Sequence, residues 1–196
     1  MKSVLISIRP QWVEKIANGQ KTIEVRKTTP KEVPFKCYIY CTIGNGVKGD
    51  YLVPSGIQCG KVIGEFVCDK VDKIIPLRHT YYNYIGLPIA NVIEYGIWND
   101  DLAQMCLKKK EIDNYGKGKT LYGWHISDLK IYDRPKELSE FKKTRDKIAM
   151  TCGMQARNGL CRAIDHEELC DNIKCCFKTP RPSQSWCYVE ELKNEP

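Results

Sequence analysis

Apolar residues along this chain recur mostly at the two-residue spacing of β-strands, and helical spacing is confined to a few short stretches. Residues 3–8, SVLISI, indicate a buried opening strand. Pro10 suits the first turn of a helix, and Asn18 followed by Gly19 provides a C-terminal stop. Between these points one helical face collects the apolar residues Trp12, Val13, Ile16 and Ala17. The chain is therefore predicted to open with a strand and a short amphipathic helix.

Further strands are predicted at five later segments, residues 22–27, 35–42, 60–71, 122–132 and 185–192. In the fourth of these, apolar positions change from even to odd numbers, which predicts a bulge near Ser127 and Asp128. Residues 100–115 favour a helix in one or two short pieces. Residues 76–98 and 142–180 fit neither pattern and are interpreted as insertions. Strands dominate, so we expect one α+β domain over residues 1–196, built as a small mixed β-barrel with short flanking helices.

Composition supports a globular protein, because hydrophobic residues make up 42% of the 196 residues and charged residues 28%. No apolar run approaches the roughly 20 residues that span a bilayer, and the opening apolar stretch is too short for a signal peptide. We therefore expect a cytoplasmic protein that does not enter membranes. The net charge is +7, and residues 1–36 alone hold eight Lys or Arg against three Glu. This local excess favours an anionic partner, of which nucleic acid is the commonest, although a solubilising surface is the alternative.

The segment GQKTIEVR, residues 19–26, combines charges in a pattern that suits a binding site. In a strand, Thr22, Glu24 and Arg26 share one face, while Ile23 and Val25 point the other way into the core. Lys21 lies at the preceding turn, from which its long side chain can reach over the same face. The pattern is compatible with a ligand site or with a solvated ladder of ion pairs.

Four other residues are candidates for the same site. Glu65 is a lone carboxylate on a strand that is apolar on both sides, so it needs a partner, for which Lys21 and Arg26 are the candidates. Such a pair would be either a structural salt bridge or a tuned acid–base pair. Arg9 lies just before the segment, and Trp124 with His125 opens a later strand. Cations beside aromatic rings suit phosphate contact and base stacking, although such aromatics also commonly serve as core residues.

The segment GQKTIEVR matches the G-x-K-x-x-E-x-R signature of the ASCH family, at Gly19, Lys21, Glu24 and Arg26. Further stretches resemble ASCH elements in the expected order: SVLISIRPQWVEKIANG, GKVIGEFVCD, TLYGWHISDLKIYD and RPSQSWCYVEEL. The chain particularly resembles the small ASCH proteins of phages and of bacteria that carry them. The resemblance implies a PUA-like β-barrel whose basic cleft binds RNA or a modified nucleoside.

The same resemblance leaves an enzymatic alternative open. Some ASCH proteins are amidohydrolases that remove the acetyl group of N4-acetylcytidine with a lysine, a threonine and a glutamate. Lys21 matches the lysine and Glu65 the glutamate, while Glu24 stands where those enzymes have the threonine. Thr22 lies on the same strand face, about 7 Å from that position. Binding of RNA or a nucleoside-derived ligand is thus the first hypothesis, an amidohydrolase the second and a ribonuclease a weaker third.

The chain contains eleven cysteines, and several crowd its last quarter. In the insertion at residues 142–180, a structural zinc ion could be held by Cys161, Cys170, Cys175 and His166. The alternative is free thiols, since no C-x-x-C motif occurs. Cys37 and Cys41 share a strand face about 13 Å apart, which is too far for a disulfide between them.

Overall fold

The computed structural model describes residues 1–43, 51–52, 56–142, 144 and 183–192. These residues form twelve strands, three short α-helices and one 3-10 helix. They divide into two compact units, which we describe separately. Unit 1 comprises Met1–Val13, Phe35–Phe66 and Lys130–Pro196, and unit 2 comprises Glu14–Pro34 and Val67–Leu129.

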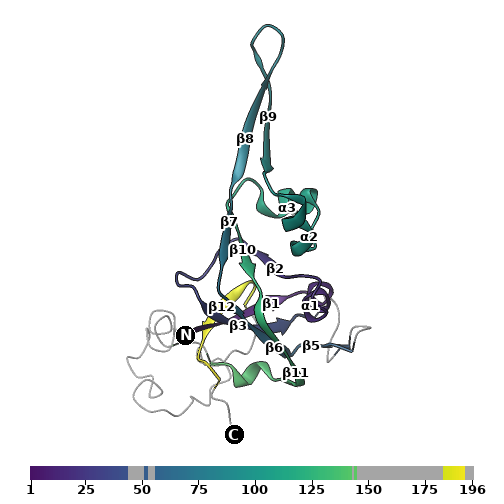
Figure 1. Cartoon of the computed structure of the whole chain (residues 1–196), viewed down its shortest axis with the longest axis vertical. Helices are drawn as coiled ribbons and strands as arrows, with labels where there is room; N and C mark the ends of the chain where they lie inside the picture. The colour runs from purple at the N-terminus through teal and green to yellow at the C-terminus, as the bar shows by residue number, and fades with distance from the viewer. Residues whose placement is uncertain (44–50, 53–55, 143, 145–182, 193–196) are drawn as a thin grey trace, which may run out of the picture. The chain divides into compact units, whose positions relative to one another are not determined.

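A five-stranded sheet forms the centre of unit 1, in the order β11-β6-β3-β1-β12. Its strands are β1 (Lys2–Ile8), β3 (Phe35–Cys41), β6 (Val62–Cys68), β11 (Ser127–Lys136) and β12 (Trp186–Val189). Strand β1 runs parallel to β3 and antiparallel to β12, as Figure 1 shows for the purple and yellow strands. Because β1 is paired on both edges and buried along both faces, its sequence is a continuous apolar run rather than an alternating one.

The core of unit 1 packs around aromatic side chains of β3. Buried residues of this cluster are Leu5, Tyr38, Tyr40, Val62, Phe141 and Val189. The rings of Tyr38 and Phe141 meet edge to face with their centroids 5.0 Å apart. Phe141 follows the 3-10 helix η1 (Leu138–Glu140). A short two-stranded ribbon, β4 (Tyr51–Leu52) and β5 (Gln58–Cys59), completes the unit.

Strands β6 and β11 approach each other closely at Gly64. A Cβ atom at this position would lie 2.5 Å from the carbonyl oxygen of Lys130 and 3.1 Å from the Cα atom of Ile131. Both contacts are with backbone, which cannot move aside as a side chain can. Glycine is therefore required here by the space between two strands.

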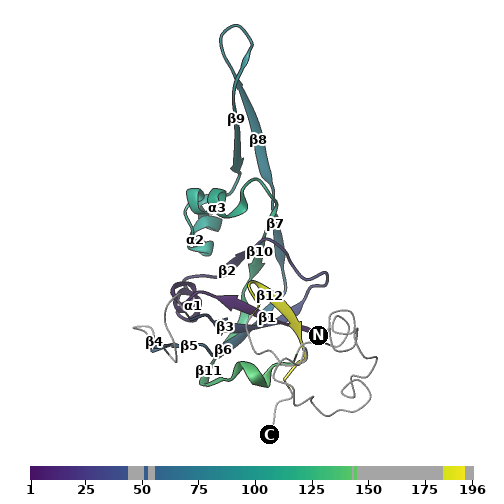
Figure 2. The same cartoon turned by 180° about the vertical axis from the view of Figure 1, so that it is seen from behind.

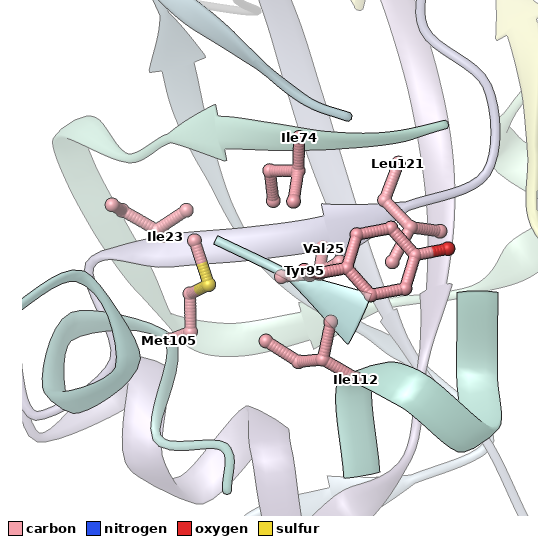
Figure 3. Packing of buried hydrophobic residues seen from close by; sticks show 7 residues of the cluster. All are labelled: Ile23, Val25, Ile74, Tyr95, Met105, Ile112 and Leu121. Carbon is pink, nitrogen blue, oxygen red and sulfur yellow. The ribbon is translucent and has the colours of Figure 1, made fainter. Parts of the chain in front are cut away.

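Unit 2 is built on a three-stranded antiparallel sheet in the order β2-β10-β7. The strands are β2 (Ile23–Arg26), β7 (Val71–Ile74) and β10 (Leu121–His125), and the helices α2 (Asn99–Met105) and α3 (Lys109–Gly116) belong to the same unit. Helix α1 (Pro10–Ala17) precedes β2 along the chain. Apolar side chains of the sheet and the two helices form one cluster with Tyr95, the last residue of β9 (Pro88–Tyr95). Figure 3 shows this cluster: Ile23, Val25, Ile74, Tyr95, Met105, Ile112 and Leu121.

The residues between β7 and α2 form a long β-hairpin, β8 (Pro76–Tyr82) and β9 (Pro88–Tyr95). Figures 1 and 2 show the hairpin continuing from β7 and extending past α2 and α3 within unit 2. Tyr95, at its base, is buried and its hydroxyl donates to the carbonyl of Lys119 over 2.5 Å. The rest of the hairpin is largely exposed.

The observed elements confirm a mostly β protein with short helices. The predicted insertion at residues 76–98 is chiefly the β8–β9 hairpin, and the helix expected over residues 100–115 is two helices. They are separated after Cys106, whose φ of 53° is left-handed and ends α2. The predicted bulge near Ser127 corresponds to a break between β10 and β11, with Asp128 at a φ of 47°.

The closed barrel expected from the sequence is not seen among the strands that the structure describes. They form four separate open sheets, and the largest ends at β11 on one side and β12 on the other. Nearly all of the cysteine-containing insertion lies outside the described residues, and the prediction of a single domain stays a prediction. None of the described helices is long and apolar enough to cross a membrane.

Candidate functional site

The residues of GQKTIEVR are held in place by backbone hydrogen bonds within unit 2. Gly19 takes a φ of 76° and ends α1, after which the Lys21 N–H donates to the carbonyl of Lys15 over 2.9 Å. The Thr22 N–H then donates to the carbonyl of Gln104 over 3.0 Å. The backbone is thereby fixed at Lys21 and at the residue after it, so the Lys21 side chain enters the unit in a defined direction.

Lys21, Glu24 and Arg26 form a buried, ion-paired set, which we call the charged trio. The Lys21 Nζ lies 3.4 Å from Oε2 of Glu24, and the Arg26 Nε lies 3.1 Å from Oε1 of the same carboxylate. Lys21 also donates to the carbonyl of Met105 over 2.6 Å. The three residues are only 2%, 6% and 8% exposed. The trio is therefore a buried cluster rather than the solvated ladder that the sequence also allowed.

Tyr115, which the sequence did not single out, lies beside the trio. The Lys27 Nζ sits 4.8 Å from the centre of its ring. Burial raises the pKa of the Tyr115 hydroxyl. The positive charge of Arg26 lowers this pKa, and the negative charge of Glu24 raises it. Tyr115 remains 37% exposed. The site thus has an aromatic residue that only the fold brings to β2, from the far end of α3.

The two aromatic candidates on β10 have different surroundings. Trp124 lies opposite Glu24 in the β2–β10 ladder and is fully buried. His125 is partly exposed, and its Nε2 lies 2.5 Å from Oδ2 of Asp72. Burial favours a raised pKa for the Asp72 carboxyl, but hydrogen bonds from His125 and Lys70 outweigh it and lower that pKa.

Glu65 lies in unit 1, where β6 runs between β3 and β11. Tyr132 of β11 donates to its Oε2 over 2.6 Å, and the Lys36 Nζ of β3 lies 3.8 Å from its Oε1. Lys36 is closer to Glu191, at 2.9 Å, and this hydrogen bond raises its pKa. The carboxylate thus finds partners on its two neighbouring strands. Its predicted pairing with Lys21 or Arg26 stays a prediction.

Arg9 is exposed at the end of β1, where its carbonyl accepts hydrogen bonds from Trp12 and Val13 and so begins α1. The candidate zinc ligands Cys161, Cys170, Cys175 and His166 all lie outside the described residues. Within the part of the chain that is described, no group of three or more His, Cys, Asp or Glu residues could hold a metal ion.

Two thiols that the sequence did not pair lie next to each other in unit 1. The Sγ atoms of Cys41 and Cys59 are 3.4 Å apart, and both residues are buried as free thiols. Burial raises the pKa of each. The sequence separates Cys37 from Cys41 along one strand. The thiol next to Cys41 is instead that of Cys59, which lies on a different strand, β5.

Comparison with solved structures places this geometry in a known fold. The crystal structure of ASCH from Zymomonas mobilis aligns over 97% of this chain and 89% of its own, with 17% sequence identity and a TM-score of 0.51. Two mutant structures of the same protein align with TM-scores of 0.49 and 0.44, at 16% and 17% identity. The mutant structure with the TM-score of 0.49 covers 97% of this chain and 89% of its own chain. The one with the TM-score of 0.44 covers 70% of this chain and 77% of its own. No protein-family model matches the sequence, and a search of curated proteins found no significant match. The likeness shows that the chain has the fold of an ASCH domain.

Proposed function

We propose that this chain, with its ASCH fold, binds RNA or a modified nucleoside through the charged trio of Lys21, Glu24 and Arg26. One observation supports this most strongly: three ionisable side chains, each less than a tenth exposed, occupy a single four-residue strand and the turn before it. Buried ion pairs are weak sources of stability, because desolvation offsets their attraction and apolar residues often replace them without loss. A role in ligand binding therefore explains the trio better than a role in folding.

The chemistry of the trio and its neighbours suits a nucleotide. Two cations and one carboxylate give the trio a net positive charge, which favours phosphate or a polarised carbonyl oxygen. Glu24 can accept hydrogen bonds from the amino edge of a base, and the partly exposed Tyr115 offers an aromatic ring for stacking. We expect the ligand to lie against this face of unit 2. The basic cleft, the cytoplasmic location and the likeness to phage proteins belong to the same proposal.

Amidohydrolase activity on N4-acetylcytidine is the second candidate, because Lys21 places an amine 3.4 Å from a carboxylate. The carboxylate, however, already has a cation facing each of its oxygens. The hydroxyl of Thr22 donates to Oε1 of Gln104 over 3.4 Å and not to the trio. We therefore expect turnover of N4-acetylcytidine to be absent or very slow. Robust hydrolysis that Lys21→Ala abolishes would replace the binding proposal with the enzymatic one.

Fluorescence anisotropy with short labelled RNAs and modified nucleosides tests the binding proposal. If the trio contacts about two phosphates, affinity should fall about tenfold between 50 and 200 mM salt. Lys21→Met and Arg26→Met should each weaken binding at least tenfold. Lys31→Met, a change at an exposed lysine of the same basic segment, should leave it unchanged. Equal effects of all three substitutions would mean that general charge, not the trio, attracts the ligand.

A further inference from the structure

The β8–β9 hairpin carries an unusual amount of exposed apolar surface. Tyr84, at its turn, is 98% exposed, and the large apolar side chains around it are all more than a third exposed. They are Tyr81, Tyr82, Ile85, Leu87, Ile89, Val92 and Ile93. Scattered apolar residues are ordinary on protein surfaces, but a contiguous set of this size marks an interaction site.

The same stretch contains no formal charge. Residues 80–93, TYYNYIGLPIANVI, include no Lys, Arg, His, Asp or Glu, in a chain of which 28% is charged. Nucleic acid needs cations at its binding surface, so this tip is not suited to the partner proposed for the charged trio. A surface without charge instead suits a partner that is itself apolar and uncharged.

The backbone of the hairpin also remains open to pairing. Among the residues that the structure describes, β8 and β9 form a sheet of two strands and pair only with each other. A two-stranded hairpin is marginally stable alone, and its outer edges can accept further strands. Natural edge strands commonly carry charges that prevent such pairing, and residues 80–93 carry none.

We propose that residues 80–93 form a self-association surface, on which the hairpin of a second copy of this chain packs. Two identical tips without charge meet with no like-charge repulsion, and two-fold dimers are the commonest soluble oligomers. Three exposed tyrosines at about 100–200 Å² each present about 300–600 Å² per copy, and the exposed Ile, Leu and Val side chains bring the tip toward the roughly 800 Å² per partner of a standard interface. The proposal is independent of the charged trio.

Sedimentation velocity of the full chain over a dilution series tests this proposal. We expect a reversible dimer with a dissociation constant of roughly micromolar order. Tyr82→Lys and Ile89→Lys should each weaken the dimer at least tenfold, because they place two like charges in the symmetric interface. Val33→Lys adds the same charge at an exposed apolar residue outside the hairpin and should have no effect.

A second variant guards against misfolding of the point mutants. Replacement of residues 79–92 by Asn-Gly links the paired residues Arg78 and Ile93, so it shortens the hairpin while keeping the register of its base, and it should give a folded monomer by circular dichroism. A monomer at every concentration of the natural chain would overturn the proposal. So would a dimer that these changes leave intact, or a monomer whose tip binds neutral phosphatidylcholine vesicles instead.

Discussion

Glu24→Gln tests whether the charged trio is as costly to disturb as its burial implies. The substitution keeps the shape of the side chain but removes its charge, leaving Lys21 and Arg26, 2% and 8% exposed, beside a neutral amide. Removing one partner of a buried ion pair typically costs about 3–5 kcal/mol. That is a large part of the roughly 5–15 kcal/mol by which a domain is stable. We therefore expect Glu24→Gln to be folded but strongly destabilised.

Urea denaturation followed by circular dichroism measures this loss. With an m-value of about 2 kcal/mol/M, a loss of 3–5 kcal/mol lowers the midpoint by about 2 M at unchanged m. Glu32→Gln, at an exposed glutamate of the same segment, should change the free energy of unfolding by about 0.5 kcal/mol or less. If the two substitutions cost the same, the trio is not an energetically coupled buried set and the reasoning fails.

The combined change Lys21→Met, Glu24→Leu and Arg26→Met separates folding from binding. Because all three charges leave together, no buried charge loses its partner, and we expect the triple variant to be more stable than Glu24→Gln. RNA or nucleoside binding should nevertheless be lost. If the triple variant binds as tightly as the natural protein, the trio is not part of the binding site.

Other consequences can be measured independently. Gly64→Ala should cost about 2 kcal/mol or more and lower the melting temperature by several degrees, because its Cβ would lie 2.5 Å from the Lys130 carbonyl oxygen. Burial raises the pKa of Cys68 to about 12, so peptide mapping after alkylation at pH 8 should find this thiol unmodified until the protein unfolds. Asp72→Asn should be destabilising at neutral pH, and the difference from the natural protein should vanish as the pH falls below 3.8 and through the lowered pKa of Asp72. Elemental analysis should find one zinc per chain if the C-terminal cysteines and histidine bind it as predicted, and free thiols with no metal would contradict that.

Local periodicity was sufficient to predict the five strands of the large sheet in unit 1, but only β2 and β10 in unit 2. The continuous apolar run of β1 and the aromatic-rich β3 have strong strand patterns, and the predicted ranges overlap the observed ones. The clustering of Lys21, Glu24 and Arg26 was also predictable, since spacing along one strand and its turn determines it. Their burial was not, because it depends on α2 and α3, which the sequence shows only as a helical region.

Long-range contacts account for the rest of what was missed. Tyr115 approaches β2 from another helix, and Glu65 meets Tyr132 from a strand far along the chain. The same limit applies to Trp124, which the fold buries opposite Glu24 in the β2–β10 ladder. The hairpin at residues 76–98 had no clear pattern because its apolar side chains do not alternate between a core and solvent; both of its faces are exposed.

The position of β1 between β3 and β12 has a consequence for how the chain folds during synthesis. Ser3 pairs with Val189, so one edge of this apolar strand stays open until residue 189 has left the ribosome. Residues 67–129, in contrast, contain most of unit 2 as one continuous stretch and can begin folding much earlier. Nascent chains that stop before β12 should therefore hold a folded hairpin and helices beside an aggregation-prone strand, and they should depend on chaperones.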